Sequence, residues 1–346
     1  MTGVQTCALP ICIEQYIRVR GRSRANPVLL VLHGGPGSTL GATACRWQGA
    51  LEAAFTVFHW DQRGSGNTYY RDPAAPPPTV ERLLSDLDEL VDALRARYGR
   101  DRLFLLGHSW GSLLGGLYAL RRPEKLSAWL PVSQMVDFKR SEQVSAAEAI
   151  RRARGAGREE DAERLAQELE QVLALRRLDR AGAEALLRFR RRKERYLPPQ
   201  YGGPSPLGGL AAPELTGNDL RWKLRFDRML AANAALYEEL LGGLSLDGCP
   251  PRYGVPVILT AGGGTGPRPI HWRRPITIPC RPPARHFSPC RTRGTCPSGS
   301  GRRSGAISCW TRWRKSDRPP ATGWSGVCRQ WERPPSMALS SARVQW

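Results

Sequence analysis

Short apolar runs separated by an amphipathic stretch dominate the first 135 residues of the chain. Residues 27–32 (Pro-Val-Leu-Leu-Val-Leu), 55–60 and 103–106 are runs of strand length, and continuous runs are typical of strands buried on both faces of a parallel sheet. Between the second and third runs, Val and Leu recur at helical spacing from Val80 to Leu94. Thr79 and Gly99 are suitable end residues. This stretch therefore predicts a helix that packs beneath the third strand.

Each of the three predicted strands ends in a glycine-rich segment. These segments are His33–Gly37, Asp61–Gly66 and Gly107–Gly111. In an open parallel sheet, ligands bind in the crevice outside the carboxyl ends of the strands. The sequence therefore predicts an α/β fold in which the three segments line one crevice.

The third segment, Gly-His-Ser-Trp-Gly, places Ser109 between the strand 103–106 and an apolar stretch that begins at Ser112. A serine at the centre of G-x-S-x-G sits on a sharp strand-to-helix turn, with its hydroxyl above the sheet edge. In a chain that holds 36 Gly the pentapeptide alone is weak, and its position after a predicted strand strengthens it. Ser109 is therefore a candidate nucleophile.

The trio HGGPG, DQRGSG and GHSWGS resembles the proline iminopeptidase group of α/β-hydrolases, and the similarity extends from about residue 13 to residue 261. The resemblance implies a mostly parallel sheet flanked by helices, with an inserted helical cap. It also implies a serine aminopeptidase that releases an N-terminal residue, preferentially proline, from short peptides. Related members act on other small amides or esters, so an esterase or amidase is an alternative.

The oxyanion hole of the predicted site consists of backbone groups. After attack by Ser109, one N–H comes from Trp110, the residue after the nucleophile, and the other from the Gly34–Gly35 turn. Each such donor contributes about 3 kcal/mol in the transition state. Asp61 and Arg63 are predicted to brace the crevice as an ion pair or loop support, and His108 is predicted to pack rather than to act as the base.

The acid and base of the triad are not at their usual places. Residues 255–262 read as the strand that should deliver the acid, but no carboxylate follows it up to His271. Further along the chain, the sequence around His286 resembles the family's C-terminal histidine loop, so His286 is the candidate base. Asp137, after the strand that begins at Leu126, is the candidate acid. Its alternative role is that of a helix N-cap.

The segment 137–247 is rich in Arg, Glu and Ala and is predicted to be the helical cap, between the core parts 13–136 and 248–262. Caps close over the crevice and select the substrate. An aminopeptidase needs a carboxylate to pair with the substrate ammonium. The sequence leaves five candidates open: Glu142, Glu194, Asp227, Glu238 and Glu239.

Residues 263–346 differ from the rest of the chain. They hold 16 Lys and Arg against two acids, so the preceding residues carry +7 of the net charge of +21. No helical or alternating period is present, so we expect a disordered tail. Its Arg, Pro, Trp and Cys content favours translation in a shifted reading frame over a basic arm for nucleic acid. The absence of any C-x-x-C pair there argues against zinc.

Residues 1–12 resemble translated sequencing adapter rather than a signal peptide, and family-like sequence begins near Ile13, with residues 15–21 as an edge strand. Cys45 and Cys249 are the cysteines left between these two segments, which gives no disulfide framework and favours the cytoplasm. No apolar stretch approaches the roughly 20 residues of a membrane span. No metal, cofactor, nucleic acid or membrane partner is predicted, and the oligomeric state is left open.

Two hypotheses follow from these patterns. The chain is a serine aminopeptidase impaired by loss of the usual acid and histidine, or it is a non-catalytic product that only binds small ligands. A serine without a general base is a poor nucleophile, so the distinction depends on the triad.

Overall fold

The computed structural model describes residues 2–8, 13–197, 212–247 and 253–259. The described strands form a twisted sheet in the order β1-β2-β4-β3-β5-β6, in which β4, β3, β5 and β6 are parallel and β1 and β2 are antiparallel additions. This is the mostly parallel sheet that the apolar runs predicted. The strands are β1 (Thr2–Ala8), β2 (Glu14–Arg20), β3 (Val28–Leu32), β4 (Thr56–Asp61), β5 (Leu103–His108) and β6 (Leu126–Val132).

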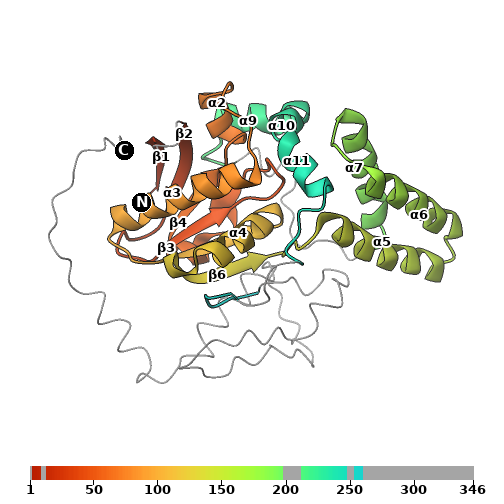
Figure 1. The fold of residues 1–346 in the computed structure, drawn as a ribbon, viewed down its shortest axis with the longest axis horizontal. Helices are drawn as coiled ribbons and strands as arrows, with labels where there is room; N and C mark the ends of the chain where they lie inside the picture. Colours follow the sequence, from red (N-terminus) through yellow and green to blue (C-terminus); the bar gives the residue numbers. More distant parts are fainter. Residues whose placement is uncertain (1, 9–12, 198–211, 248–252, 260–346) are drawn as a thin grey trace, which may run out of the picture.

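Helices flank the sheet and continue into a separate group beside it (Figure 1). α3 and α4 lie against the sheet, α9 to α11 lie over the end of the sheet near α2, and α5 to α7 project away from it. The helices and 3-10 turns are η1 (Gly41–Arg46), α1 (Gly49–Glu52), α2 (Gly66–Arg71), α3 (Val80–Tyr98), α4 (Trp110–Arg121), η2 (Pro123–Lys125), α5 (Phe138–Gly155), α6 (Glu159–Ala174), α7 (Arg180–Glu194), α9 (Gly217–Leu224), α10 (Phe226–Ala232) and α11 (Ala234–Leu241).

The core lies between the sheet and helices α3 and α4. All five residues of β3 are buried, and the leucine face of α3 packs in the same cluster as β5. Both predicted ends of α3 are confirmed: the Thr79 hydroxyl accepts the N–H of Arg82, and Gly99 adopts the left-handed conformation at φ 57°. These local signals fix the helix because each satisfies backbone groups that the helix itself cannot pair.

The prediction of an edge strand at residues 15–21 is wrong. β2 lies inside the sheet, because β1 pairs with it in antiparallel register from Thr2↔Arg20 to Ala8↔Glu14. A free strand edge presents a row of unpaired N–H and C=O groups, and any extended segment nearby can pair with it. The segment 2–8 takes that place although its sequence has no family character.

The charged region after β6 is divided into several helices. The first two, α5 and α6, are separated at Gly157, which has φ 69°. The predicted strand 255–262 is represented by one parallel bridge, Trp129↔Val257, supported by hydrogen bonds from Trp129 N to Pro256 O (2.8 Å) and from Ile258 N to Trp129 O (2.9 Å). In the part of the chain that the structure describes, no helix is long and apolar enough to cross a bilayer.

Candidate active site

The three glycine-rich segments meet at the carboxyl edge of the sheet. They follow β3, β4 and β5, which are neighbours in parallel register. Contact between the first and third segments is direct, since a Cβ added to Gly34 would lie 3.3 Å from Ser109 Cβ and 3.2 Å from His108 O. A side chain at Gly34 would therefore press on the serine, and glycine lets the two backbones approach.

Ser109 occupies a strained turn between β5 and α4. Its backbone lies at φ 53° and ψ −117°, a conformation that a non-glycine residue adopts at a cost of about 1–3 kcal/mol. Glycine is required on both sides: a Cβ on Gly107 would lie 2.2 Å from Gly111 O, and one on Gly111 would lie 2.4 Å from Leu32 O. The serine is partly exposed, which is compatible with a nucleophile on this turn.

Several backbone groups around Ser109 are engaged within the fold. The Ser109 N–H donates to Val132 O at 3.0 Å, and Ser109 O accepts from the N–H (2.8 Å) and hydroxyl (2.6 Å) of Ser112. Trp110 is the first residue of α4. The first amides of a helix have no partner within the helix, which makes the Trp110 N–H a suitable donor to an oxyanion.

A buried network joins the three segments behind this turn. The indole N–H of Trp110 donates to Gln62 Oε1 at 3.1 Å, while Gln62 donates to His33 twice, from its side chain to His33 O (3.1 Å) and from its backbone N–H to His33 Nε2 (3.2 Å). His33 Nδ1 lies 2.8 Å from Gly34 O. Because Nε2 accepts a hydrogen bond, the neutral tautomer with the proton on Nδ1 satisfies both contacts. The sequence placed His33 and Gln62 in two of the segments that line the crevice but gave neither side chain a role.

Burial lowers the pKa of His33 to about 4. We expect the free energy of unfolding to fall by about 3 kcal/mol through this group as the pH drops from 6.5 towards 4, because the unfolded histidine binds a proton that the folded one excludes. The measurement is urea unfolding from pH 7.5 to 4 for the wild type and His33→Gln.

Asp61 opposes this trend. Burial raises the pKa of Asp61 to about 6. Its contribution to the free energy of unfolding is therefore largest at low pH and is lost as the pH rises through 6. Subtracting the free energy of unfolding of His33→Gln from that of the wild type cancels the Asp61 contribution, because both proteins contain Asp61. A difference that stays constant from pH 6.5 to 4 would contradict the assignment of a neutral, buried His33.

The predicted loop brace is present, but with another partner. Arg63 forms its ion pair with Asp86 on α3, through contacts of 2.8 and 2.7 Å. Asp61 instead accepts the backbone N–H (2.9 Å) and the side-chain N–H (3.2 Å) of Asn67 at the start of α2. Each side chain therefore fixes the second segment to a different helix.

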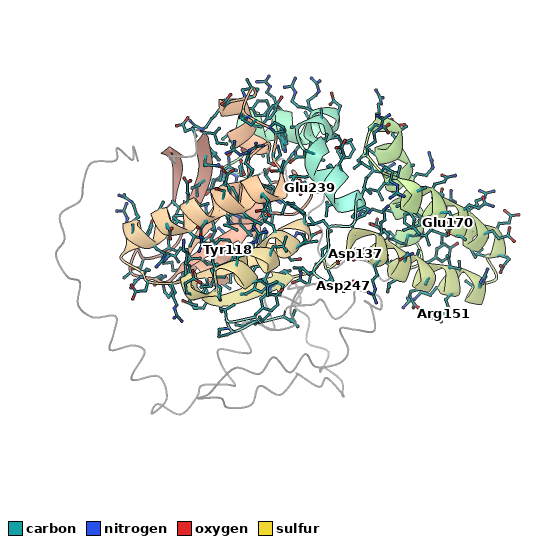
Figure 2. All side chains as sticks on the ribbon, viewed as in Figure 1. Tyr118, Asp137, Arg151, Glu170, Glu239 and Asp247 are labelled. Carbon is teal, nitrogen blue, oxygen red and sulfur yellow. The ribbon has the colours of Figure 1, made fainter. Side chains whose placement is uncertain are left out.

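The sequence-derived acid, Asp137, lies within the described residues, whereas the sequence-derived base does not. Asp137 is the N-cap of α5, where its side chain accepts the N–H of Arg140 at 2.7 Å, and Figure 2 shows it where the chain leaves β6 for α5. This is the alternative role that its position suggested. His286 lies outside the described residues. His108 is partly exposed, and its Nδ1 would lie 3.1 Å from a Cβ on Gly34.

Three of the five candidate ammonium partners have their carboxylates engaged elsewhere. Glu142 is buried between Lys193 and Arg190, and these cations lower its pKa against the effect of burial. Asp227 pairs with Arg225, and Glu239 accepts the N–H of Val80 at the start of α3 at 3.1 Å (Figure 2). The two others, Glu194 and Glu238, are exposed.

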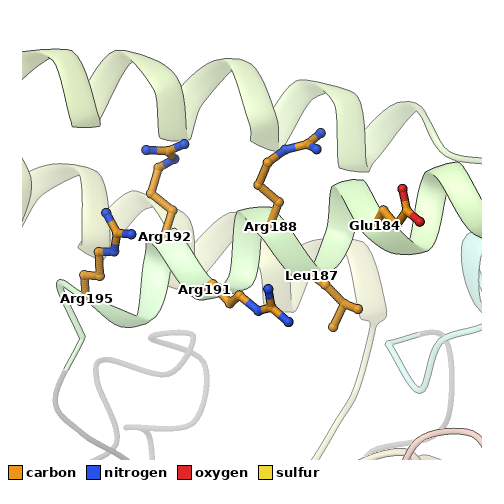
Figure 3. A pocket seen from close by; sticks show the side chains of 6 residues that line it. All are labelled: Glu184, Leu187, Arg188, Arg191, Arg192 and Arg195. Atoms are coloured by element: carbon orange, nitrogen blue, oxygen red, sulfur yellow. The ribbon is translucent and has the colours of Figure 1, made fainter. Parts of the chain in front are cut away.

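A shallow pocket lies along α7, apart from the glycine segments (Figure 3). Its lining contains no nucleophile, and Arg192 is paired with Glu168 at 3.0 Å. This pocket is not part of the site around Ser109. Its lining residues are Glu184, Leu187, Arg188, Arg191, Arg192 and Arg195.

The parallel sheet, the strained serine turn and the glycine segment against it are those of the α/β-hydrolase fold. Residues 23–172 match the family model described as "Serine aminopeptidase, S33", which confirms the resemblance seen in the sequence. A solved structure of proline iminopeptidase from Mycobacterium smegmatis superposes with a TM-score of 0.51 at 22% identity, covering 78% of this chain and 85% of that one. At this identity the likeness shows the fold alone.

Two curated relatives carry the sequence comparison. The chain is 36% identical over 124 residues to the probable aminopeptidase YbaC of Bacillus subtilis (strain 168), which covers 36% of this chain and 39% of the relative. It is 33% identical over 106 residues to the proline iminopeptidase of Lactobacillus delbrueckii subsp. lactis. This match covers 30% of this chain and 35% of the relative. The matched region thus spans little more than a third of the relatives' length.

Proposed function

We propose that the chain is a serine hydrolase that releases an N-terminal residue, preferentially proline, from short peptides through an acyl-enzyme. The observation that carries the proposal is the placement of Ser109 on a strained turn at φ 53°, in contact with Gly34. The substrate class is supported by two relatives, one named a probable aminopeptidase and the other a proline iminopeptidase.

In the proposed reaction, Ser109 Oγ bonds to the carbonyl carbon of the N-terminal residue while its proton passes to a general base. The oxyanion receives the Trp110 N–H and an N–H of the Gly34–Gly35 turn. The C–N bond then breaks as the proton moves to the leaving amine, and water hydrolyses the resulting ester. We assign the base to His286 and the acid to Asp137, whose carboxylate also caps α5.

The helical segment 137–247 supplies the proposed cap. Helices α9 to α11 lie over the end of the sheet where the glycine segments are found (Figure 1). A cap in this position excludes water and restricts the substrate to a short chain end. Glu238, which is exposed on α11, is the proposed partner of the substrate ammonium, since α7, which carries Glu194, projects away from the sheet.

The test compares three chromogenic substrates. We expect the purified chain to release p-nitroaniline from proline p-nitroanilide and to leave N-acetylproline p-nitroanilide intact, because acetylation removes the charged amine. Turnover is measured against Ser109→Ala prepared in parallel. Cleavage of a p-nitrophenyl ester alone would identify an esterase instead, and no turnover above Ser109→Ala would establish the non-catalytic alternative.

A further inference from the structure

Three side chains from α9 to α11 bind the backbone carbonyls of two glycine segments. The Trp222 indole N–H donates to Gly37 O at 2.7 Å, the Tyr237 hydroxyl donates to Pro36 O at 3.0 Å, and the Asn233 amide donates to Gly64 O at 2.9 Å. All three donors are buried, with relative exposures of 2%, 8% and 1%. We call Trp222, Asn233 and Tyr237 the carbonyl clamp.

Glycines make the close approach of these helices possible. Gly37 has φ 94°, and a Cβ there would lie 2.6 Å from Met229 Cγ and 3.1 Å from Asn233 Nδ2. Gly64 has φ 70°, and its Cβ would lie 3.0 Å from Ala232 O. The clamp and the glycines therefore form one packed contact between the helices and both segments.

The clamp is anchored to the sheet at its far side. Asp219 on α9 pairs with Arg18 of β2 at 2.5 Å, and both side chains are almost fully buried. Asn67, at the start of α2, donates to the same carboxylate at 2.9 Å. Thr216 and Asp219 form a capping box at the start of α9. These contacts hold α9 in place, so Trp222 presents a fixed donor to Gly37.

The first segment transmits this position to the serine. The Ser38 N–H donates to Gly34 O at 3.1 Å, which closes a turn over Gly35, Pro36 and Gly37. Gly34 in turn lies against Ser109. A displacement of the Pro36 and Gly37 carbonyls therefore moves the Gly34–Gly35 amides relative to the serine.

We propose that Trp222, Asn233 and Tyr237 are positioning residues, which hold the Gly34–Gly35 amides at the distance from Ser109 that the oxyanion requires. The inference rests on the proposed function and assigns the control of kcat to helices α9 to α11. A misplacement of about 1 Å in a catalytic constellation can cost about a hundredfold in rate, and an oxyanion donor acts mainly in the transition state.

The experiment compares Tyr237→Phe and Trp222→Phe with the matched control Tyr118→Phe. Tyr118 is also buried, and its hydroxyl bonds to Asp88 at 2.9 Å (Figure 2), but it contacts neither glycine segment through that bond. With proline p-nitroanilide we expect each clamp variant to lose at least tenfold in kcat with KM within twofold. The control should keep both constants. Equal loss in the control, or a change confined to KM, would overturn the proposal.

Hydrogen exchange provides a readout that does not depend on turnover. We expect faster exchange of the amides in residues 34–39 in the clamp variants, with residues 80–98 of α3 unchanged and the control like the wild type. Unchanged exchange at 34–39 would overturn the clamp even if the chain is active. If the wild type does not exceed Ser109→Ala in turnover, the proposed function fails, and faster exchange at 34–39 then supports the clamp as the holder of the segment.

Discussion

Replacing Ser109 with alanine is expected to lower the turnover of proline p-nitroanilide by about 10⁴- to 10⁶-fold, because the residual rate comes from substrate binding and the oxyanion donors alone. The alanine has no hydroxyl to form the acyl-enzyme, whereas the backbone of the turn is unchanged. The measurement is kcat under saturating substrate, together with the appearance of an acyl-enzyme by mass spectrometry after rapid acid quenching. The wild type should show the added acyl mass and Ser109→Ala should not.

A second substitution at the same position separates chemistry from stability. Ser109→Gly removes the same hydroxyl, but glycine populates positive φ without the strain that serine bears at φ 53°. We therefore expect Ser109→Gly to unfold at a higher urea concentration than Ser109→Ala, while both lack turnover. If Ser109→Ala retained more than a hundredth of the wild-type rate, Ser109 would not be the nucleophile.

Much of the fold was predictable from the sequence because its signals are local. Residues 28–32 of the apolar run 27–32 form β3, and all five are buried, since a strand covered on both faces has no polar positions. The helix α3 begins and ends at the predicted Thr79 and Gly99. The serine turn was predictable for the same reason, since two glycines at fixed offsets from Ser109 are the residues that the turn requires.

The contacts that hold the site were not predictable, because they join residues far apart in the chain. Trp222 meets Gly37 across 185 positions, and neither residue has a neighbour in the sequence that indicates the other. The sequence left Arg63 and the nearby Asp61 as either an ion pair or a loop support, and in the fold Arg63 pairs with Asp86, 23 positions away. The packing of the helices decides which charged side chains become neighbours, and the local sequence pattern does not encode that packing.

The same limit applies to the acid and base. A triad assembles from three strand ends, and the sequence identifies each member only through the family pattern around it. Ser109 has that pattern, whereas the strand around Val257 is followed by residues without a carboxylate. Asp137 shows why position alone does not decide a role, since a carboxylate after a strand serves equally well to cap the next helix.

Replacing Asp86 with alanine is expected to lower the free energy of unfolding by about 3–5 kcal/mol, because it leaves a buried guanidinium without its partner. Asp86 and Arg63 are 0% and 3% exposed, and two hydrogen bonds join them. The measurement is urea unfolding at pH 7.5, with the double variant Arg63→Met/Asp86→Leu as the control. Removing both charges should restore most of the lost stability, since an apolar pair of similar volume replaces a buried ion pair at little cost.

The Asp86 variants also test whether the second segment depends on α3 for its geometry. Arg63 follows Gln62, which holds both His33 and the Trp110 ring in place. Loss of the ion pair should therefore move Gln62 and reduce kcat in the single variant, and the double variant should recover it together with stability. A loss below about 1 kcal/mol in Asp86→Ala, the magnitude of a solvated surface pair, would show that water reaches Arg63 and that the segment is held by other contacts.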